Sequence, residues 1–239
     1  MLRIVSPAMA TSVGPSSLPA RTSRSLPQRI VVCACAAVAI RNQVFQHKAH
    51  AITDETSTLG GNLDVNERAA KVELLLMDVD GVLTDGRLYN VPLPDGRMVE
   101  TKGFDSQDGI ALQWMHWSNI KTGLISGRIS PATDERAKQC KFAYVYQGHI
   151  EKIPILQEIL THSGVAPENV CYIGDDLTDI VVMRRVGFSI ATANARPEVK
   201  GVAHWTTSAP GGSGAVREVC ELILQAKGLW DALMTKYEV

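Results

Sequence analysis

The 239-residue sequence has few aromatic residues, no long hydrophobic run and no acidic residue before Asp54. Aromatic side chains make up only 5% of the chain, so aliphatic residues must build most of any core. The longest uninterrupted apolar run covers residues 30–40, eleven in all, whereas a membrane-spanning helix needs about 20. The sequence therefore predicts no membrane anchor.

An excess of charge of either sign is also missing, since 24 basic and 25 acidic side chains leave a formal charge of −1. Proteins that bind nucleic acids usually carry a clear basic excess, so this balance gives no support to that class. The small sum hides two different segments. Residues 1–53 carry +6 and residues 54–239 carry −7.

The basic segment, residues 1–53, is rich in Ser, Pro and Ala and lacks acids, as organellar transit peptides do. It predicts import into a plastid or a mitochondrion. Two alternatives stay open, a disordered cytosolic tail and a secretory signal with an A-x-A-like cleavage site at residues 49–51. We expect a linker over residues 54–71, one folded domain over 72–230 and a tail over 231–239.

Cysteines are few and do not have the spacing of a metal site or a redox motif. Cys33 and Cys35 lie in the basic segment, and Cys140, Cys171 and Cys220 are far apart in the chain. Buried thiols in a reduced compartment are the expected outcome.

Short apolar runs alternate with helical patterns from residue 72 onward. The expected strands are 72–79, 120–125, 143–146, 170–173 and 188–191. The expected helices are 108–117, 131–140, 152–162, 176–186 and 214–227. This alternation is typical of βαβ units, and it predicts a three-layer, Rossmann-like α/β fold with helices on both faces of a parallel sheet.

One segment, residues 85–102, breaks the alternation. A Pro-Asp-Gly turn at 94–96 separates 87–91 from 97–101, which predicts a β-hairpin that projects from the sheet.

Two carboxylates, Asp78 and Asp80, follow the apolar run 74–77. Residues i and i+2 of an extended chain point the same way, so the two acids should lie close together and suit a divalent cation. A calcium loop does not fit, because Val82 and Tyr89 occupy positions that need oxygen ligands. The remaining alternative is that both acids only cap the strand end.

Polar residues also follow three other expected strands. These are Ser126, Gly127 and Arg128 after 120–125, Lys152 after 143–146, and Asp175, Asp176 and Asp179 after 170–173. The serine suits a phosphoryl oxygen, and a lysine at a helix start, which the helix dipole disfavours, indicates a nearby anion. The acids suit Mg²⁺. Considered one at a time, Lys152 could be an ordinary surface lysine, and the acids after 170–173 could be helix-capping residues.

The order and spacing of these motifs resemble the haloacid dehalogenase-like phosphatase superfamily over about residues 72–227. The resemblance implies that Asp78 is the nucleophile, forming an aspartyl-phosphate, and that Asp80 is the general acid/base. It further implies the following roles: phosphoryl binding by Ser126 and Lys152, Mg²⁺ binding by Asp78, Asp175 and the backbone carbonyl of Asp80, and a supporting role for Asp176 and Asp179.

The insertions are too short for a cap domain, with 42 positions from Thr84 to Ser126 and 23 from Lys152 to Asp175. Further segments resemble the capless, tetrameric members of the superfamily: 104–110, 146–148, 174–177 and 211–220. The resemblance implies an eight- or nine-carbon sugar-acid phosphate as substrate. It also implies a homotetramer in which the hairpin 85–102 lines the neighbouring active site.

Three positions depart from this pattern, since Gln107 and Ser213 stand where an arginine is usual and Asn194 where an aspartate is usual. Arg128 and Arg217 then remain as candidates for binding the substrate carboxylate. Two non-catalytic alternatives stay open. One is a receiver domain phosphorylated on Asp78, which would leave Asp80 without a role, and the other is a scaffold that keeps the fold.

Overall fold

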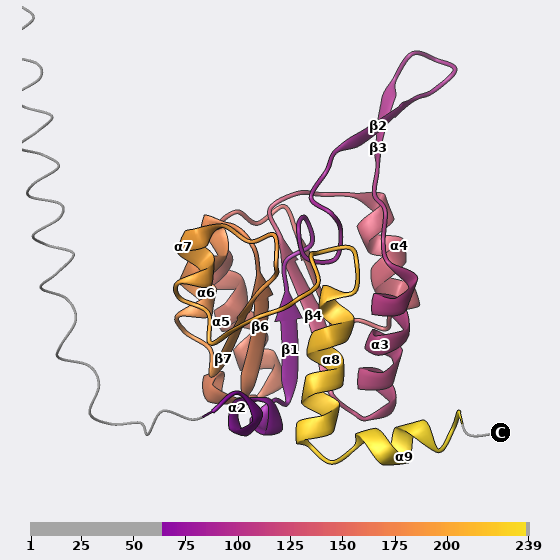
Figure 1. Ribbon diagram of the computed structural model, residues 1–239. Coiled ribbons are helices and arrows are strands. Elements are labelled where there is room, and N and C mark those ends of the chain that lie inside the picture. Colours follow the sequence, from indigo (N-terminus) through magenta and orange to yellow (C-terminus); the bar gives the residue numbers. More distant parts are fainter. Residues whose placement is uncertain (1–63, 238–239) are drawn as a thin grey trace, which may run out of the picture. The chain divides into compact units, whose positions relative to one another are not determined.

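A computed structural model describes residues 64–237, which form a six-stranded parallel sheet in the order β5-β4-β1-β6-β7-β8 (Figure 1). The strands are β1 (Leu74–Met77), β4 (Lys121–Ser126), β5 (Tyr144–Gln147), β6 (Val170–Gly174), β7 (Phe188–Ala191) and β8 (Trp205–Thr206). The predicted α/β fold with a flanked parallel sheet is confirmed.

Helices cover both faces of this sheet (Figure 1). The core on one face includes residues of α2 (Val65–Lys71), α3 (Ser106–Trp117), α4 (Pro131–Gln139), α8 (Ala215–Ala226) and α9 (Trp230–Met234). The core on the other face includes residues of α5 (Lys152–Ser163), α6 (Ile180–Met183) and α7 (Pro197–Lys200). Two short 3₁₀ helices, η1 (Pro167–Asn169) and η2 (Leu177–Asp179), flank β6.

The central strand β1 is apolar at every position because both of its faces are buried. Leu75 and Met77 belong to the first core, whereas Leu74 and Leu76 belong to the second. Full burial of one such side chain contributes about 1.5–3 kcal/mol to stability. Since β1 pairs with β4 on one side and β6 on the other, the residues that follow these three strands meet at one edge.

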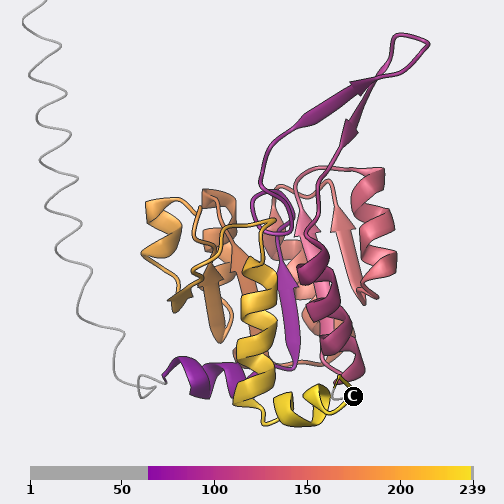
Figure 2. The same cartoon turned by 45° about the vertical axis from the view of Figure 1, so that its right-hand side comes forward.

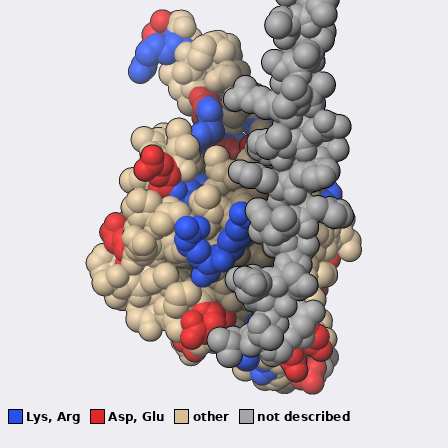
Figure 3. All heavy atoms as spheres, turned by 90° about the vertical axis from the view of Figure 1, so that its left-hand side faces the viewer, with Lys and Arg blue, Asp and Glu red and all other residues tan. Residues whose placement is uncertain are grey.

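The predicted hairpin consists of β2 (Tyr89–Pro92) and β3 (Met98–Thr101), which pair antiparallel and project from the sheet (Figures 1 and 2). Gly96 adopts a φ of +82° in the turn, a conformation that glycine tolerates best. Charges of both signs lie at the end of the hairpin (Figure 3), where Arg97 Nε is 2.8 Å from Asp95 Oδ2.

Helix α8 begins without a cap of its own, because its N-cap residue is Gly214. Asp108 of α3 supplies the cap instead, since its Oδ1 accepts a hydrogen bond from the Arg217 backbone N–H at 2.8 Å. This contact joins two helices that lie side by side on one face of the sheet (Figures 1 and 2).

Several expected boundaries differ from the structure. The expected linker contains α2, which begins with a capping box in which Asp64 and Glu67 bond each other's backbone N–H groups at 2.7 and 3.1 Å. The expected tail contains most of α9 and Tyr237, whose hydroxyl accepts from Trp114 Nε1 at 2.7 Å. The helix expected over 176–186 divides into η2 and α6, because Asp176 caps the short η2 first.

The three cysteines after residue 63 are free and buried, as predicted. None of the helices between residues 64 and 237 is long and apolar enough to cross a membrane. The predicted transit peptide, residues 1–53, lies outside the described residues.

Candidate active site

A cavity of about 300 Å³ lies beyond the carboxyl ends of β1, β4 and β6. Parallel α/β sheets bind ligands at such a point, where the strand order changes direction. The residues lining the cavity are Asp78, Asp80, Gly86, Ser126, Gly127, Arg128, Ile150, Lys152, Asp175, Asp176 and Thr178. The structure thus brings together all but two of the residues predicted for the site, and the exceptions are Asp179 and Arg217.

Asp78 and Lys152 line this cavity and form an ion pair with each other. The Lys152 side chain is 2% exposed, and its Nζ lies 3.0 Å from Asp78 Oδ1 and 2.7 Å from Asp179 Oδ1. Burial disfavours the charged amine, but these two carboxylates outweigh it and hold the pKa of Lys152 above its ordinary value. The Lys152 ammonium group is therefore fixed beside Asp78.

Asp179 lies behind the cavity and fixes its neighbours. One oxygen, Oδ1, accepts from Lys152 and from the Tyr172 hydroxyl at 2.7 Å. The other, Oδ2, accepts from the backbone N–H groups of Asp175 at 3.0 Å and Asp176 at 3.2 Å. Asp179 is thus a positioning residue for both the lysine and the loop that follows β6.

Three carboxylates gather without enough positive charge around them. Oxygens of Asp78, Asp175 and Asp179 lie within 4.8 Å of one another, and Asp175 Oδ1 is buried without a hydrogen-bond partner. Burial, reinforced by the charges of Asp179 and Asp78, raises the pKa of Asp175 to about 8. Burial also raises the pKa of Asp78 to about 6, although Lys152 opposes the shift. These donors fit a hard divalent cation such as Mg²⁺.

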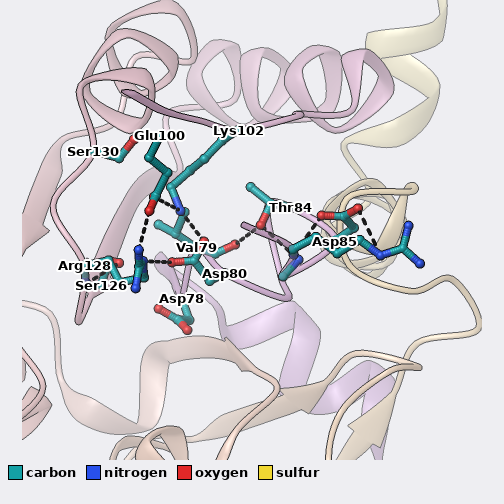
Figure 4. Close-up of polar contacts among 12 residues, drawn as sticks. Asp78, Val79, Asp80, Thr84, Asp85, Glu100, Lys102, Ser126, Arg128 and Ser130 are labelled. Atoms are coloured by element: carbon teal, nitrogen blue, oxygen red, sulfur yellow. Dashed lines mark hydrogen bonds and ion pairs between the residues drawn. The ribbon is translucent and has the colours of Figure 1, made fainter. Parts of the chain in front are cut away.

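Asp80 takes part in a different group of charges (Figure 4). Its carboxylate forms an ion pair with Lys102, and Arg128 Nε lies 4.0 Å from its Oδ2. Glu100 contacts both cations, pairing with Arg128 and lying 3.3 Å from Lys102 Nζ. The Asp80 side chain therefore lies outside the group of three carboxylates, so only its backbone carbonyl is left as the predicted Mg²⁺ ligand.

Ser126 is buried at the end of β4, and its hydroxyl accepts from the Arg128 backbone N–H at 3.2 Å. Gly127 and Arg128 follow it at the cavity wall, and the Arg128 side chain is 47% exposed. The end of β4 thus places a small hydroxyl group and an arginine side chain at the cavity wall.

Arg217 does not line this cavity, and its role in binding the substrate carboxylate stays a prediction. Its Nε lies 2.6 Å from Glu221 Oε1, and its guanidinium lies over the Trp114 ring at 4.8 Å. The side chain therefore belongs to the packing of α8 against α3.

Hydrogen bonds from Thr192 and Asn194 hold the loop that follows Asp80 in place. The carbonyl of Gly81 accepts from Thr192 Oγ1 at 3.3 Å and from Asn194 Nδ2 at 3.0 Å, and Asn194 Oδ1 accepts from the Gly211 N–H at 2.6 Å. A carboxylate could not donate to Gly81, so asparagine suits this position in this chain. Any side chain at Gly81 would collide with Asp175, whose Oδ2 would lie 2.0 Å from the new Cβ.

Lys102 and Glu100 were not predicted as site residues. Both were included in the predicted hairpin, but nothing in their local pattern distinguishes them from other charged hairpin residues. Thr178 was also missed, although it lies among the predicted acids after β6.

We predict that Mg²⁺ stabilises the protein more at pH 8 than at pH 6. The pKa of Asp175 in the folded protein lies above its ordinary value of 3.8, so ionising this carboxyl group destabilises the fold. The metal-free protein therefore becomes less stable as pH rises from about 4 to about 8. A bound cation relieves this cost, and at pH 6 it must first displace a proton.

The measurement is the Mg²⁺-induced change in Tm at each pH, with NaCl of equal ionic strength as the control for screening. Equal changes in Tm at pH 6 and pH 8 would contradict the assignment of Asp175 to the cation site.

Comparison with known proteins shows what this arrangement is similar to. A model of the haloacid dehalogenase-like hydrolases matches residues 126–218, a span that includes Ser126, Lys152 and Asp175. The 3-deoxy-D-manno-octulosonate 8-phosphate phosphatase of Yersinia pestis is 42% identical over 164 residues, which are 69% of this chain and 86% of that protein.

Solved structures agree with the sequence match. The crystal structure of the Yersinia pestis phosphatase is 41% identical, with a TM-score of 0.67 over 70% of this chain and 89% of that one. The phosphatase of Moraxella catarrhalis, solved in complex with a magnesium ion, a phosphate ion and a KDO molecule, is 38% identical. Its TM-score is 0.68 over 72% of this chain and 97% of the other.

Proposed function

This chain belongs to the haloacid dehalogenase-like hydrolase family, and from that membership we propose that it is a Mg²⁺-dependent phosphatase. Its substrate is 3-deoxy-D-manno-octulosonate 8-phosphate, which it hydrolyses to the free sugar acid and phosphate. The similar phosphatases of Yersinia pestis and Moraxella catarrhalis support this substrate. The observation that carries the proposal is the placement of Asp78, Lys152 and Asp175 around one cavity.

In the first step a carboxylate oxygen of Asp78 attacks phosphorus, and the bond from phosphorus to the sugar oxygen breaks. Asp80 gives its proton to that oxygen, so the sugar leaves as a neutral alcohol. Lys152 and Ser126 hold the phosphoryl oxygens, whose charge needs fixed donors in the transition state.

In the second step a water molecule attacks the phosphorus of the aspartyl-phosphate and gives a proton to Asp80. The bond from phosphorus to Asp78 breaks, which releases phosphate and restores both carboxyl groups. Bound Mg²⁺, held by Asp78, Asp175 and the Asp80 backbone carbonyl, would neutralise charge on the transferred group. Asp179 keeps Lys152 and the Asp175 loop in place throughout.

The test is phosphate release by the full chain from a panel of phosphate monoesters, with Mg²⁺ or with EDTA. The panel includes 3-deoxy-D-manno-octulosonate 8-phosphate, N-acetylneuraminate 9-phosphate and p-nitrophenyl phosphate. We expect the eight-carbon ester to have the highest kcat/KM and EDTA to abolish its turnover. If the nine-carbon ester has the highest kcat/KM, the proposed substrate is wrong and the nine-carbon ester takes its place. If no ester is hydrolysed in a Mg²⁺-dependent reaction, the protein is not the proposed enzyme.

For the assembly we propose a homotetramer in which the hairpin reaches the active site of a neighbouring subunit. The hairpin supports this, because its large hydrophobic side chains are exposed in a single chain: Leu88, Tyr89, Val91, Met98 and Val99. Exposed apolar groups of this kind favour contact with another protein surface.

Deletion of residues 90–98 is expected to lower the oligomeric state and to reduce kcat/KM about tenfold or more, because water is then less well excluded from the site. Light scattering gives the mass, and phosphate release gives the activity. Wild-type mass and activity in the deletion variant would show that the hairpin has neither role. Glu100 and Lys102 remain in this variant, so only the outer hairpin is tested.

For the location of the protein we propose import into an organelle, directed by residues 1–53. The composition of this segment supports the proposal, since it has six basic and no acidic residues. A fluorescent protein carrying residues 1–53 should enter plastids or mitochondria, and a diffuse cytosolic signal would contradict the proposal.

A further inference from the structure

The inner end of the hairpin enters the active site of its own chain. Lys102 directly follows β3, and its side chain is only 2% exposed. Buried lysines need a compensating charge, and here two carboxylates, Asp80 and Glu100, supply it. Figure 4 shows Lys102 reaching from the hairpin strand toward Asp80.

We propose that Lys102 is the positioning residue that holds the carboxyl group of Asp80 in place for proton transfer to the leaving oxygen. This inference rests on the proposed phosphatase activity, in which Asp80 is the general acid/base. The Lys102 ammonium binds one oxygen of Asp80, Oδ1, and leaves Oδ2 for the reaction. A general acid must be held within hydrogen-bond reach of its target, so fixing one oxygen fixes the other.

No other side chain in residues 64–237 holds Asp80 as firmly. Its only other polar side-chain contact in that range is with Arg128, whose Nε is 4.0 Å from Oδ2. The Arg128 guanidinium is itself paired with Glu100 and is half exposed. Lys102 is buried, so its position relative to Asp80 is the better defined of the two.

Glu100 completes the arrangement by holding Lys102 from the other side. Its Oε1 is buried and lies 3.3 Å from Lys102 Nζ. Glu100 and Lys102 lie on the same face of an extended strand end, two residues apart. The hairpin therefore presents a carboxylate and an ammonium as one unit, and the ammonium reaches the reacting acid.

The test compares two leaving groups in Lys102→Met. A sugar alcohol needs a proton as it leaves, whereas p-nitrophenolate leaves without one. We expect kcat for the sugar-acid phosphate to fall about 100-fold or more, the usual range for loss of general acid catalysis. The single-turnover rate constant for release of p-nitrophenolate, which reports only the first step, should change less than about threefold.

Lys121→Met is the matched control, because Lys121 is exposed at the opposite end of β4. It should leave both rates unchanged. Glu100→Gln is a second variant in case Lys102→Met does not fold, and it should show the same selective loss at smaller size. Equal loss with both leaving groups, or no loss with either, would overturn the positioning role. Absence of turnover in the wild type would instead contradict the proposed function itself.

Discussion

Asp78→Asn is expected to lower kcat by about 10⁴-fold or more while leaving the fold intact. The amide has the size of the carboxylate but cannot form the bond to phosphorus. Lys152 keeps its contact with Asp179 at 2.7 Å, so the buried cation is not left unpaired. Since burial raises the pKa of Asp78 to about 6, loss of its charge should not destabilise the metal-free protein at pH 8.

The measurement is single-turnover phosphate release together with the free energy of unfolding in EDTA. Asp231→Asn, at the exposed start of α9, is the control for an amide at a site remote from the cavity. Residual turnover within about 100-fold of wild type would mean that another group is the nucleophile, because loss of a nucleophile usually costs far more.

Lys152→Met should have the second largest effect, and it acts on stability as well as on activity. Without the ammonium, the carboxylates of Asp78 and Asp179 lie buried with no cation between them. Removing one partner of a buried ion pair usually costs about 3–5 kcal/mol. We expect that loss at pH 8 in EDTA, and a smaller one at pH 5, where Asp78 gains a proton. Activity should fall about 10²-fold or more, as for loss of a donor to the transition state.

Urea unfolding at the two pH values measures the loss of stability. The double variant Lys152→Met/Asp179→Asn is the control, because it also removes one of the uncompensated charges. It should recover part of the free energy of unfolding but none of the activity. If the single variant were as stable as wild type at both pH values, Lys152 would not be compensating these carboxylates.

The candidate site could be predicted largely because its residues follow parallel strands. Asp78, Ser126 and Asp175 each come directly after an apolar run, and the sheet order brings those three ends to one edge. Lys152 could be placed for a related reason, since it begins the helix that follows β5. Local sequence pattern and the rule for ligand sites in parallel sheets were sufficient there.

The residues that the sequence did not predict act through long-range contacts. Lys102 is 22 positions from Asp80, and its burial depends on how the hairpin leaves the sheet. Arg217 was a candidate for the substrate carboxylate from its residue type, and in the structure it contacts Trp114 and Glu221 and does not line the cavity. Helix α2 is different, because its capping box is visible in the sequence at Asp64 and Glu67 and could have been found.

The cap that Asp108 provides for α8 has a consequence for how the chain folds during its synthesis. The buried face of α8, with Val219 and Ile223, completes the core between α2 and α3, although α8 is translated long after either helix. Until α8 leaves the ribosome, that core stays open to water and Asp108 has no helix to cap. A nascent chain that stops before Gly214 should therefore be less stable than the whole domain, because the apolar residues that α8 covers stay exposed until this late helix arrives.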